Sequence, residues 1–397
     1  MTQTQKGHAS AGLIVLICFF IAALEGYDIQ AFGVSVSKLA PEFGLNPSQI
    51  GHAASAAMIG LVLGAIGGGW LADRVGRKPV LLGSVAAFGV FSVITALTHD
   101  FNHMLLARLI TGLGFGGAMP NLIAVATEIS PPNRRAATVT TMFCGMPAGG
   151  ACVALLARFA PELDWRTIFM IGGVLPILLL PVIFFFLPET RPEQDKSLER
   201  GMMRTLFGEG RGLSTVLLWL AFVLTLIVLY LLLNWLPTLV IDKGLTAADG
   251  AAASLAFNLT SIAGALMLGF FVDRAGFRWP LVITYALLAV VMLGLGQAVG
   301  LSPVLILSGL AGFLVLGAQY SLYAVAPALY PPHVRAAGAG AAVGIGRLGS
   351  IAGPLIAGDL RQAGYSADQV LMFMAPVVVV AGVAILLLGA LNRQRAD

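Results

Sequence analysis

The chain alternates between long apolar stretches and short polar connections. A helix needs about 20 apolar residues to cross a bilayer, and twelve stretches reach that length. Because the connections are short, the pattern predicts an all-α membrane protein with twelve transmembrane helices. We expect these helices at 12–34, 49–71, 79–98, 102–126, 136–158, 166–187, 213–237, 249–272, 279–299, 303–328, 336–358 and 368–391.

The second half of the pattern repeats the first. The connection GWLADRVGRK at 69–78 returns as GFFVDRAGFR at 269–278, an offset of 200 residues. The same offset links two further pairs of features, namely Gly44-Leu45 with Gly244-Leu245, and Pro131-Pro132 followed by Arg135 with Pro331-Pro332 followed by Arg335. One spacing shared by separate features indicates two homologous halves. We expect an N-terminal six-helix bundle at 1–187, a polar cytoplasmic linker at 188–212 and a C-terminal six-helix bundle at 213–397.

Composition agrees with a membrane protein and excludes several other classes. Hydrophobic residues make up 58% of the chain, charged residues only 11%, and the mean hydropathy is +0.90. A soluble chain of this length would need a more charged surface. The basic residues lie in short loops rather than on one face, which argues against nucleic acid as a partner. No nucleophile motif, metal-ligand cluster or cofactor loop is present, so we expect neither an enzyme nor a bound metal or cofactor.

Lysine and arginine give the orientation. With the N-terminus inside, sixteen of them fall in loops on the cytoplasmic side and five on the opposite side. Such a bias is typical of the positive-inside rule. Both termini and Lys196 should therefore be cytoplasmic, and Lys243 should face outward.

Four ionisable residues interrupt the apolar stretches: Glu25, Asp28, Arg108 and Arg347. A charge inside a span costs about 2.5 kcal/mol or more, so such residues are functional candidates. Glu25 and Asp28 stand three apart and share a helical face, where two carboxylates in a low dielectric favour binding of a proton. We favour Asp28 as the proton carrier, with Arg108 as its countercharge. The alternatives are that both acids line a wet vestibule and that Arg108 forms a permanent structural ion pair.

Arg347 stands in GIGRLGSIAGP with no acid within one helical turn. An anionic ligand explains such a cation best, since a guanidinium grips a carboxylate with two hydrogen bonds. Pairing with an acid on another helix is the alternative. Aromatic and amide side chains would complete a site for an aromatic anion, although an aromatic stripe also occurs as packing or as an interface belt. The candidates are Tyr27, Tyr230, Asn234, Trp235, Tyr320 and Tyr323, with Arg108 as a second arginine that could receive the anion.

The charged loop at 69–78 is expected to pair with a residue outside it. At the offset of 200, Arg77 and Glu128 correspond to Phe277 and Ala328, so both charges vanish together. This joint loss predicts an ion pair at the cytoplasmic surface. We expect a gating or structural motif made of Gly69, Asp73, Arg74, Gly76, Arg77, Lys78 and Glu128, with Asp273 and Arg274 as its weaker copy.

These loops resemble the signature of the major facilitator superfamily over essentially the whole chain. Within it, the chain resembles the aromatic acid:proton symporter family, through EGYD at 25–28, ARLITGLGFGGAMPNLIAVATE at 107–128, NWLPTL at 234–239 and GIGRLGSIAGP at 344–354. That family usually has Asp at both acidic positions of the first motif, whereas the first acid here is Glu25. The resemblance implies two pseudo-symmetric six-helix bundles and proton-coupled uptake, by alternating access, of a benzoate, hydroxybenzoate or phenylpropionate relative. It also implies a monomer in the bacterial inner membrane.

Two other functions remain open at this point. Exporters of the superfamily usually carry GPxxGG on the fifth helix, where this chain has the imperfect GMPAGG at 145–150. A closer match, GPLIAG, lies at 353–358 on the eleventh predicted helix, so uptake is favoured over export of drugs or metabolites. A solute receptor that transports nothing is the other possibility.

Overall fold

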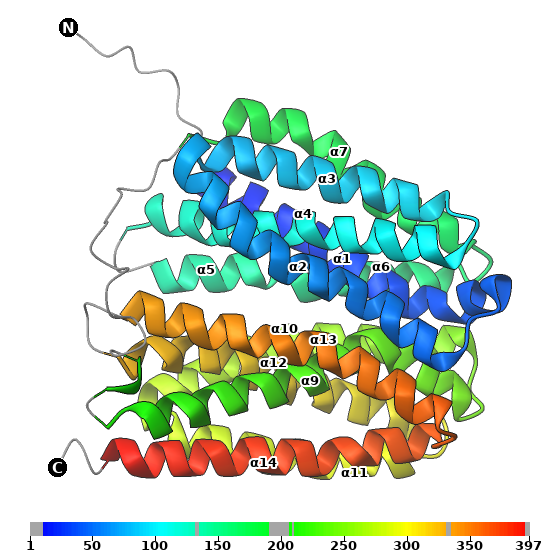
Figure 1. The fold of residues 1–397 in the computed structure, drawn as a ribbon. Coiled ribbons are helices and arrows are strands. Elements are labelled where there is room, and N and C mark those ends of the chain that lie inside the picture. Colours follow the sequence, from blue (N-terminus) through cyan, green and yellow to red (C-terminus); the bar gives the residue numbers. More distant parts are fainter. Residues whose placement is uncertain (1–10, 132–134, 190–205, 209, 331–334, 394–397) are drawn as a thin grey trace, which may run out of the picture. The chain divides into compact units, whose positions relative to one another are not determined.

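The computed structural model describes residues 11–131, 135–189, 206–208, 210–330 and 335–393, and its ordered elements are helices (Figure 1). Twelve helical segments of this described part are long and apolar enough to cross a membrane, which confirms the predicted number. The helices are α1 (Ala11–Phe43), α2 (Pro47–Val75), α3 (Arg77–Ala96), α4 (Phe101–Glu128), α5 (Arg135–Phe143), α6 (Gly145–Phe159), α7 (Trp165–Phe186), α9 (Gly212–Asp242), α10 (Ala247–Ala275), α11 (Arg278–Gln297), α12 (Leu301–Ala328), α13 (Arg335–Gln362) and α14 (Ala367–Arg393).

The described helices form two compact units. The first contains α1, α3, α4, α5 and α7, together with residues 56–75 of α2 and 145–153 of α6. The second contains α9 to α14, together with residues 44–55 and 154–161. The predicted linker at 188–212 falls largely outside the described residues, so the predicted division into two bundles and a linker stays a prediction.

Proline explains where the fifth predicted helix differs from the sequence expectation. A single helix was expected at 136–158, but the structure has α5 and α6, which meet at Cys144. Pro147 has no N–H to donate to the carbonyl four residues earlier, and this weakens the helix at that place. Pro237 does not interrupt its helix, since α9 continues through it to Asp242. Membrane helices tolerate proline where neighbouring groups satisfy the freed backbone.

Glycines set the closest helix contacts, and they do so twice. In the first unit, a side chain on Gly64 of α2 would strike the carbonyl oxygen of Leu113 on α4. In the second unit, Gly264 of α10 stands in the same relation to Phe313 of α12. Each residue lies 200 positions from its counterpart, as the repeat in the sequence requires. Small residues let membrane helices approach to backbone contact. The two units therefore share an internal packing scheme as well as sequence motifs.

Candidate functional site

Asp28 and Arg108 meet inside the first unit. Asp28 lies on α1 and is 0% exposed, while Arg108 lies on α4 and is 1% exposed. Arg108 Nη1 donates a hydrogen bond to Asp28 Oδ1, which makes a fully buried ion pair. A lone buried charge is very unfavourable, so each residue requires the other as long as both are ionised. The structure thus brings together the acid and the countercharge that the sequence predicts.

Ser92 of α3 completes this group, and the sequence analysis did not identify it. Its side chain is 0% exposed. Its hydroxyl lies within hydrogen-bond distance of Asp28 Oδ2 and also 3.2 Å from the carbonyl oxygen of Phe169 on α7. Asp28 is therefore held by α3 and α4 at the same time.

Aromatic rings surround the cation. The Arg108 guanidinium carbon lies 5.3 Å from the ring centre of Phe169 and 5.9 Å from that of Phe32. At these distances the faces of aromatic rings attract a cation. The rings also exclude water, so the charge of Arg108 is compensated by Asp28 and by polarisable carbon rather than by solvent.

The two neighbours of Asp28 in its motif are also buried. Glu25, one turn earlier on α1, is 1% exposed. Tyr27 is 6% exposed, and its hydroxyl donates to the carbonyl oxygen of Ile168 on α7 at 3.1 Å. Both acids are buried in this conformation, whereas the alternative from the sequence had them lining a wet vestibule. The hydroxyl of Tyr27 is used in fastening α1 to α7.

The internal repeat provides a signal for the two charged members of this group. At the offset of 200, Asp28, Ser92 and Arg108 correspond to Val228, Met292 and Ser308. The acid, its hydroxyl partner and its countercharge are thus replaced together in the second half. The same reasoning predicted the Arg77–Glu128 pair, and it applies to Asp28 with Arg108, whereas a serine replaced by methionine would not single out Ser92.

The second unit contains a cation of a different kind. Arg347 lies on α13, is half-buried, and donates from Nη1 to the hydroxyl of Tyr230 on α9 at 3.0 Å. The helices approach closely here because Gly346 has no side chain, and a Cβ at this position would lie 3.0 Å from the Cβ of Phe222. The position that corresponds to Arg347 in the first half is Pro147. Each half thus has one of the two arginines that lie within the spans. Arg108 is wholly buried in an ion pair, and Arg347 is partly accessible.

Aromatic rings of the second unit lie on α9 and α12. The ring of Tyr323 is 5.6 Å from that of Phe222 and 6.2 Å from that of Tyr320, centre to centre. Asn234 is 2% exposed, and its amide donates to the carbonyl oxygen of Tyr230, one turn earlier on α9. The second unit therefore places a cluster of three rings beside the helix that carries Arg347, while the Asn234 amide bonds to its own helix.

The charged loop between α2 and α3 forms the ion pair that its partial copy predicted. Arg77 Nη1 donates to Glu128 Oε1, with 14% and 38% of the two side chains exposed. Asp73 is exposed, as is its counterpart Asp273. The pairing of Arg77 with Glu128 is confirmed, whereas its part in gating stays a prediction.

Gly76 and Glu189 add a contact that the sequence did not reveal. Gly76 has φ +100°, a conformation that favours glycine, and a Cβ there would collide with the carboxylate of Glu189. Glu189 Oε1 also accepts from the backbone N–H of Lys78 at 3.5 Å, in the first turn of α3. A carboxylate is favoured at a helix N-terminus. Glu189, three residues past the end of α7, thus helps to hold this loop.

The remaining basic residues of the two loops rest on aromatic rings. The Arg74 guanidinium lies 3.7 Å from the ring centre of Trp70, and that of Arg274 lies 4.1 Å from the ring centre of Phe270. Lys78 lies 5.3 Å from the ring centre of Phe184. The stacking is repeated at the offset of 200, whereas the Arg77–Glu128 pair is not.

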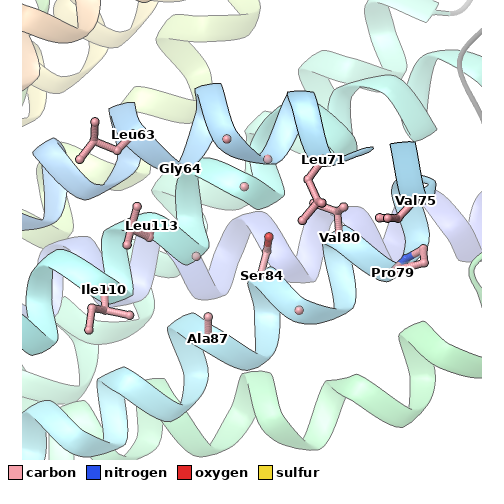
Figure 2. Close-up of a pocket in the computed structure, with 15 residues that line it drawn as sticks. Leu63, Gly64, Leu71, Val75, Pro79, Val80, Ser84, Ala87, Ile110 and Leu113 are labelled. Carbon is pink, nitrogen blue, oxygen red and sulfur yellow. The ribbon is translucent and has the colours of Figure 1, made fainter. Parts of the chain in front are cut away.

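A groove of about 680 Å³ lies between α2, α3 and α4 (Figure 2). Its walls are apolar apart from Ser84, and glycines such as Gly64 and Gly117 form part of its lining. None of its lining residues is charged, and none of the predicted proton or substrate residues takes part in it. The groove therefore offers nothing that would bind a carboxylate. Among the described residues, no group of three or more metal-ligating side chains occurs either.

Twelve apolar helices with a buried ion pair among them are typical of membrane transporters. The chain belongs to the Major Facilitator Superfamily, whose family model matches residues 18–354. Membership makes it a multi-pass membrane transporter rather than an enzyme. It is 38% identical to the 3-(3-hydroxy-phenyl)propionate transporter of Escherichia coli (strain K12), over 98% of this chain and 96% of that protein. It is 34% identical to the 4-hydroxybenzoate transporter PcaK of Pseudomonas putida, over 96% of this chain and 93% of that protein.

Solved structures share the fold. A D-xylose-proton symporter superposes with a TM-score of 0.75 at 18% identity, covering 95% of this chain and 97% of its own. A bacterial homologue of the human lysosomal transporter Spinster, in an inward-facing and unoccupied conformation, gives a TM-score of 0.78 at 17% identity, covering 95% and 96%. At these identities the likeness establishes the major facilitator fold.

Proposed function

We propose that this protein takes up an aromatic carboxylate together with a proton. The substrate class follows from relatives that transport 3-(3-hydroxy-phenyl)propionate and 4-hydroxybenzoate and match this chain over nearly its whole length. The observation that carries the coupling is the buried Asp28–Arg108 pair.

The pair couples proton and anion through charge balance. While Asp28 is ionised, the pair is neutral and stable in its dry surroundings. Protonation of Asp28 leaves Arg108 as an uncompensated cation at a place that is 1% exposed. Such a charge is costly until an anion approaches or the site opens. A proton and a carboxylate that move together add no net charge, so their joint passage avoids this cost.

Arg347 is our candidate for holding the substrate carboxylate. It is less buried than Arg108, and Tyr230 orients its guanidinium through the hydrogen bond at 3.0 Å. The rings of Tyr320 and Tyr323 supply an apolar surface for an aromatic substrate. We assign Tyr27 and Glu25 to the surroundings of Asp28, with Asn234 as a further candidate for substrate contact.

Alternating access is the proposed mechanism, with the two homologous halves as its moving parts. The Arg77–Glu128 pair and the loop around Asp73 would hold one end closed and release it during the cycle. We propose a monomer in the bacterial inner membrane with both termini in the cytoplasm. The positive-inside bias of the loops supports this orientation.

Uptake into proteoliposomes tests the proposal. Purified protein should accumulate labelled 4-hydroxybenzoate or 3-(3-hydroxyphenyl)propionate when the outside is made acidic, and collapse of the proton gradient by a protonophore should abolish accumulation. Xylose provides a control substrate of another class. Efflux in exchange for protons would indicate an exporter, and binding without movement would indicate a receptor.

A further inference from the structure

Ser92 has one hydroxyl hydrogen and two acceptors. Asp28 Oδ2 lies within hydrogen-bond distance on α1, and the Phe169 carbonyl oxygen lies 3.2 Å away on α7. A serine hydroxyl donates only one hydrogen at a time. Its side chain is 0% exposed, so no solvent competes for that hydrogen. The charge on Asp28 therefore decides which acceptor receives it.

We propose that Ser92 is a positioning residue for proton coupling, which donates to Asp28 while the carboxylate is ionised and to the Phe169 carbonyl once Asp28 is protonated. The inference rests on the proposed role of Asp28 as proton carrier. A protonated carboxyl group has its own O–H and donates to the Ser92 oxygen, which frees the serine hydrogen for α7. The proton itself comes from the aqueous phase.

This exchange changes which helices are tied together. With Asp28 ionised, Ser92 donates across to α1, and Arg108 does the same from α4. With Asp28 neutral, its own O–H keeps the hydrogen bond to Ser92, the Ser92 hydroxyl donates to the Phe169 carbonyl on α7, and the charge-assisted bond from Arg108 to α1 becomes weaker. Tyr27 still holds α1 to α7 through the Ile168 carbonyl. Binding of a proton at Asp28 is in this way converted into a change of contacts among α1, α3, α4 and α7.

Other ionisable groups near the carboxylate are few in the described part of the first unit. Glu25 and Tyr27 stand on α1 itself, Arg108 faces Asp28 from α4, and Cys152 of α6 lies close enough to interact with Tyr27. The charged residues of α3 and α7, which are Arg77, Lys78 and Arg166, stand at the helix ends. Arg108 and Ser92 are consequently the two groups that hold the Asp28 carboxylate by hydrogen bonds.

Infrared titration of the purified protein in lipid nanodiscs tests the proposal without any substrate. A protonated carboxyl band that is absent from the Asp28→Asn protein reports Asp28, and a Glu25→Gln background removes the neighbouring acid. Ser92→Ala removes a hydrogen bond from both forms of Asp28, but the bond to the ionised form is charge-assisted and the stronger of the two. The protonated band should therefore persist to higher pH, by up to about one pH unit. Ser92→Cys keeps a weak donor of similar size and should shift less.

Ser84→Ala is the matched control. Ser84 is a buried serine two turns earlier on α3, and it lies against Gly117 of α4 rather than against Asp28. Its substitution should leave the Asp28 band where it is in the native protein. If Ser92→Ala does not fold, the test uses Ser92→Cys, for which the pH midpoint of the Asp28 band should rise by a smaller amount.

The results separate the two proposals. A rise in the pH midpoint of the Asp28 band for Ser92→Ala, with Ser84→Ala unchanged, is expected, and the alkaline limit of uptake should move with it. An unshifted or lowered midpoint, or no Asp28 band over the pH range in which the protein stays folded, would overturn the role of Ser92. A native protein that accumulates no aromatic acid would instead overturn the proposed function, while the infrared titration would still decide on Ser92.

Discussion

Arg108 and Asp28 are 80 residues apart in the chain, yet their side chains form an ion pair with 1% and 0% exposure. Neither residue is stable there as a lone charge, since breaking a buried pair from one side costs about 3–5 kcal/mol. Arg108→Gln should therefore lower the free energy of unfolding by roughly that amount. The double variant Asp28→Asn/Arg108→Gln should be more stable than the sum of the single changes predicts, because no buried charge remains. Thermal unfolding in one detergent would measure all four proteins, and additive losses would contradict the pairing.

The gate pair gives a prediction of another kind. Arg77 and Glu128 are partly exposed, so their contribution to stability should be small, about 1 kcal/mol or less. If they hold the cytoplasmic end closed, Arg77→Ala and Glu128→Ala should each reduce the transport rate while substrate affinity is kept. The double variant should be no slower than the worse single variant, since both changes remove one interaction. Uptake rates together with binding by isothermal calorimetry would check this, and multiplied defects would show that the residues act separately.

Arg347 should recognise the negative charge of the substrate. A lysine ammonium does not reproduce the two-point grip of a guanidinium, so Arg347→Lys should weaken binding of 4-hydroxybenzoate by about tenfold or more, which corresponds to ~1.4 kcal/mol. Arg361→Lys is the control, because Arg361 lies on the same helix and pairs with Asp242 near its end. The amide of the substrate should bind poorly to the native protein. If the amide competes for binding as well as the acid does, Arg347 does not recognise the carboxylate and its role is structural.

The orientation of the chain has a direct chemical test. Val299 is 87% exposed between α11 and α12, and Ala275 is exposed in the charged loop that ends α10. After Cys18, Cys144 and Cys152 are replaced, Val299→Cys should react with an impermeant maleimide in intact cells. Ala275→Cys should react only after permeabilisation, because the charged loops are expected inside. The reverse pattern would contradict the positive-inside assignment.

The number of helices and the repeat could be predicted because both depend on local sequence. A span is a run of apolar residues whatever its neighbours are, and the offset of 200 residues appears in the charged loops and again in the glycine contacts of α2 and α10. Helix ends were harder to predict. The first helix reaches Phe43 rather than residue 34, and proline broke the fifth predicted helix but not α9. Whether neighbouring helices satisfy the freed backbone groups cannot be read from one stretch of sequence.

The site was predictable only as far as its charges. Asp28, Arg108 and Arg347 stand out because a charge in an apolar span is rare. Ser92 and Glu189 do not stand out, since a serine and a loop glutamate are ordinary at such places. Tyr230 was a candidate only as one of several aromatic residues, without its partner. Only tertiary packing brings Ser92 to Asp28 and Tyr230 to Arg347.

Coupling at Asp28 is the central claim, and one comparison tests it most directly. Asp28→Asn imitates the permanently protonated carboxyl group, so it should retain counterflow, in which labelled substrate exchanges for unlabelled substrate inside the vesicle. The same proteoliposomes should lose uphill accumulation driven by a proton gradient and also lose the pH dependence of uptake. Glu25→Gln should be milder, because Glu25 is assigned only to the surroundings of Asp28. An Asp28→Asn protein that still concentrates an aromatic acid against its gradient would contradict the account.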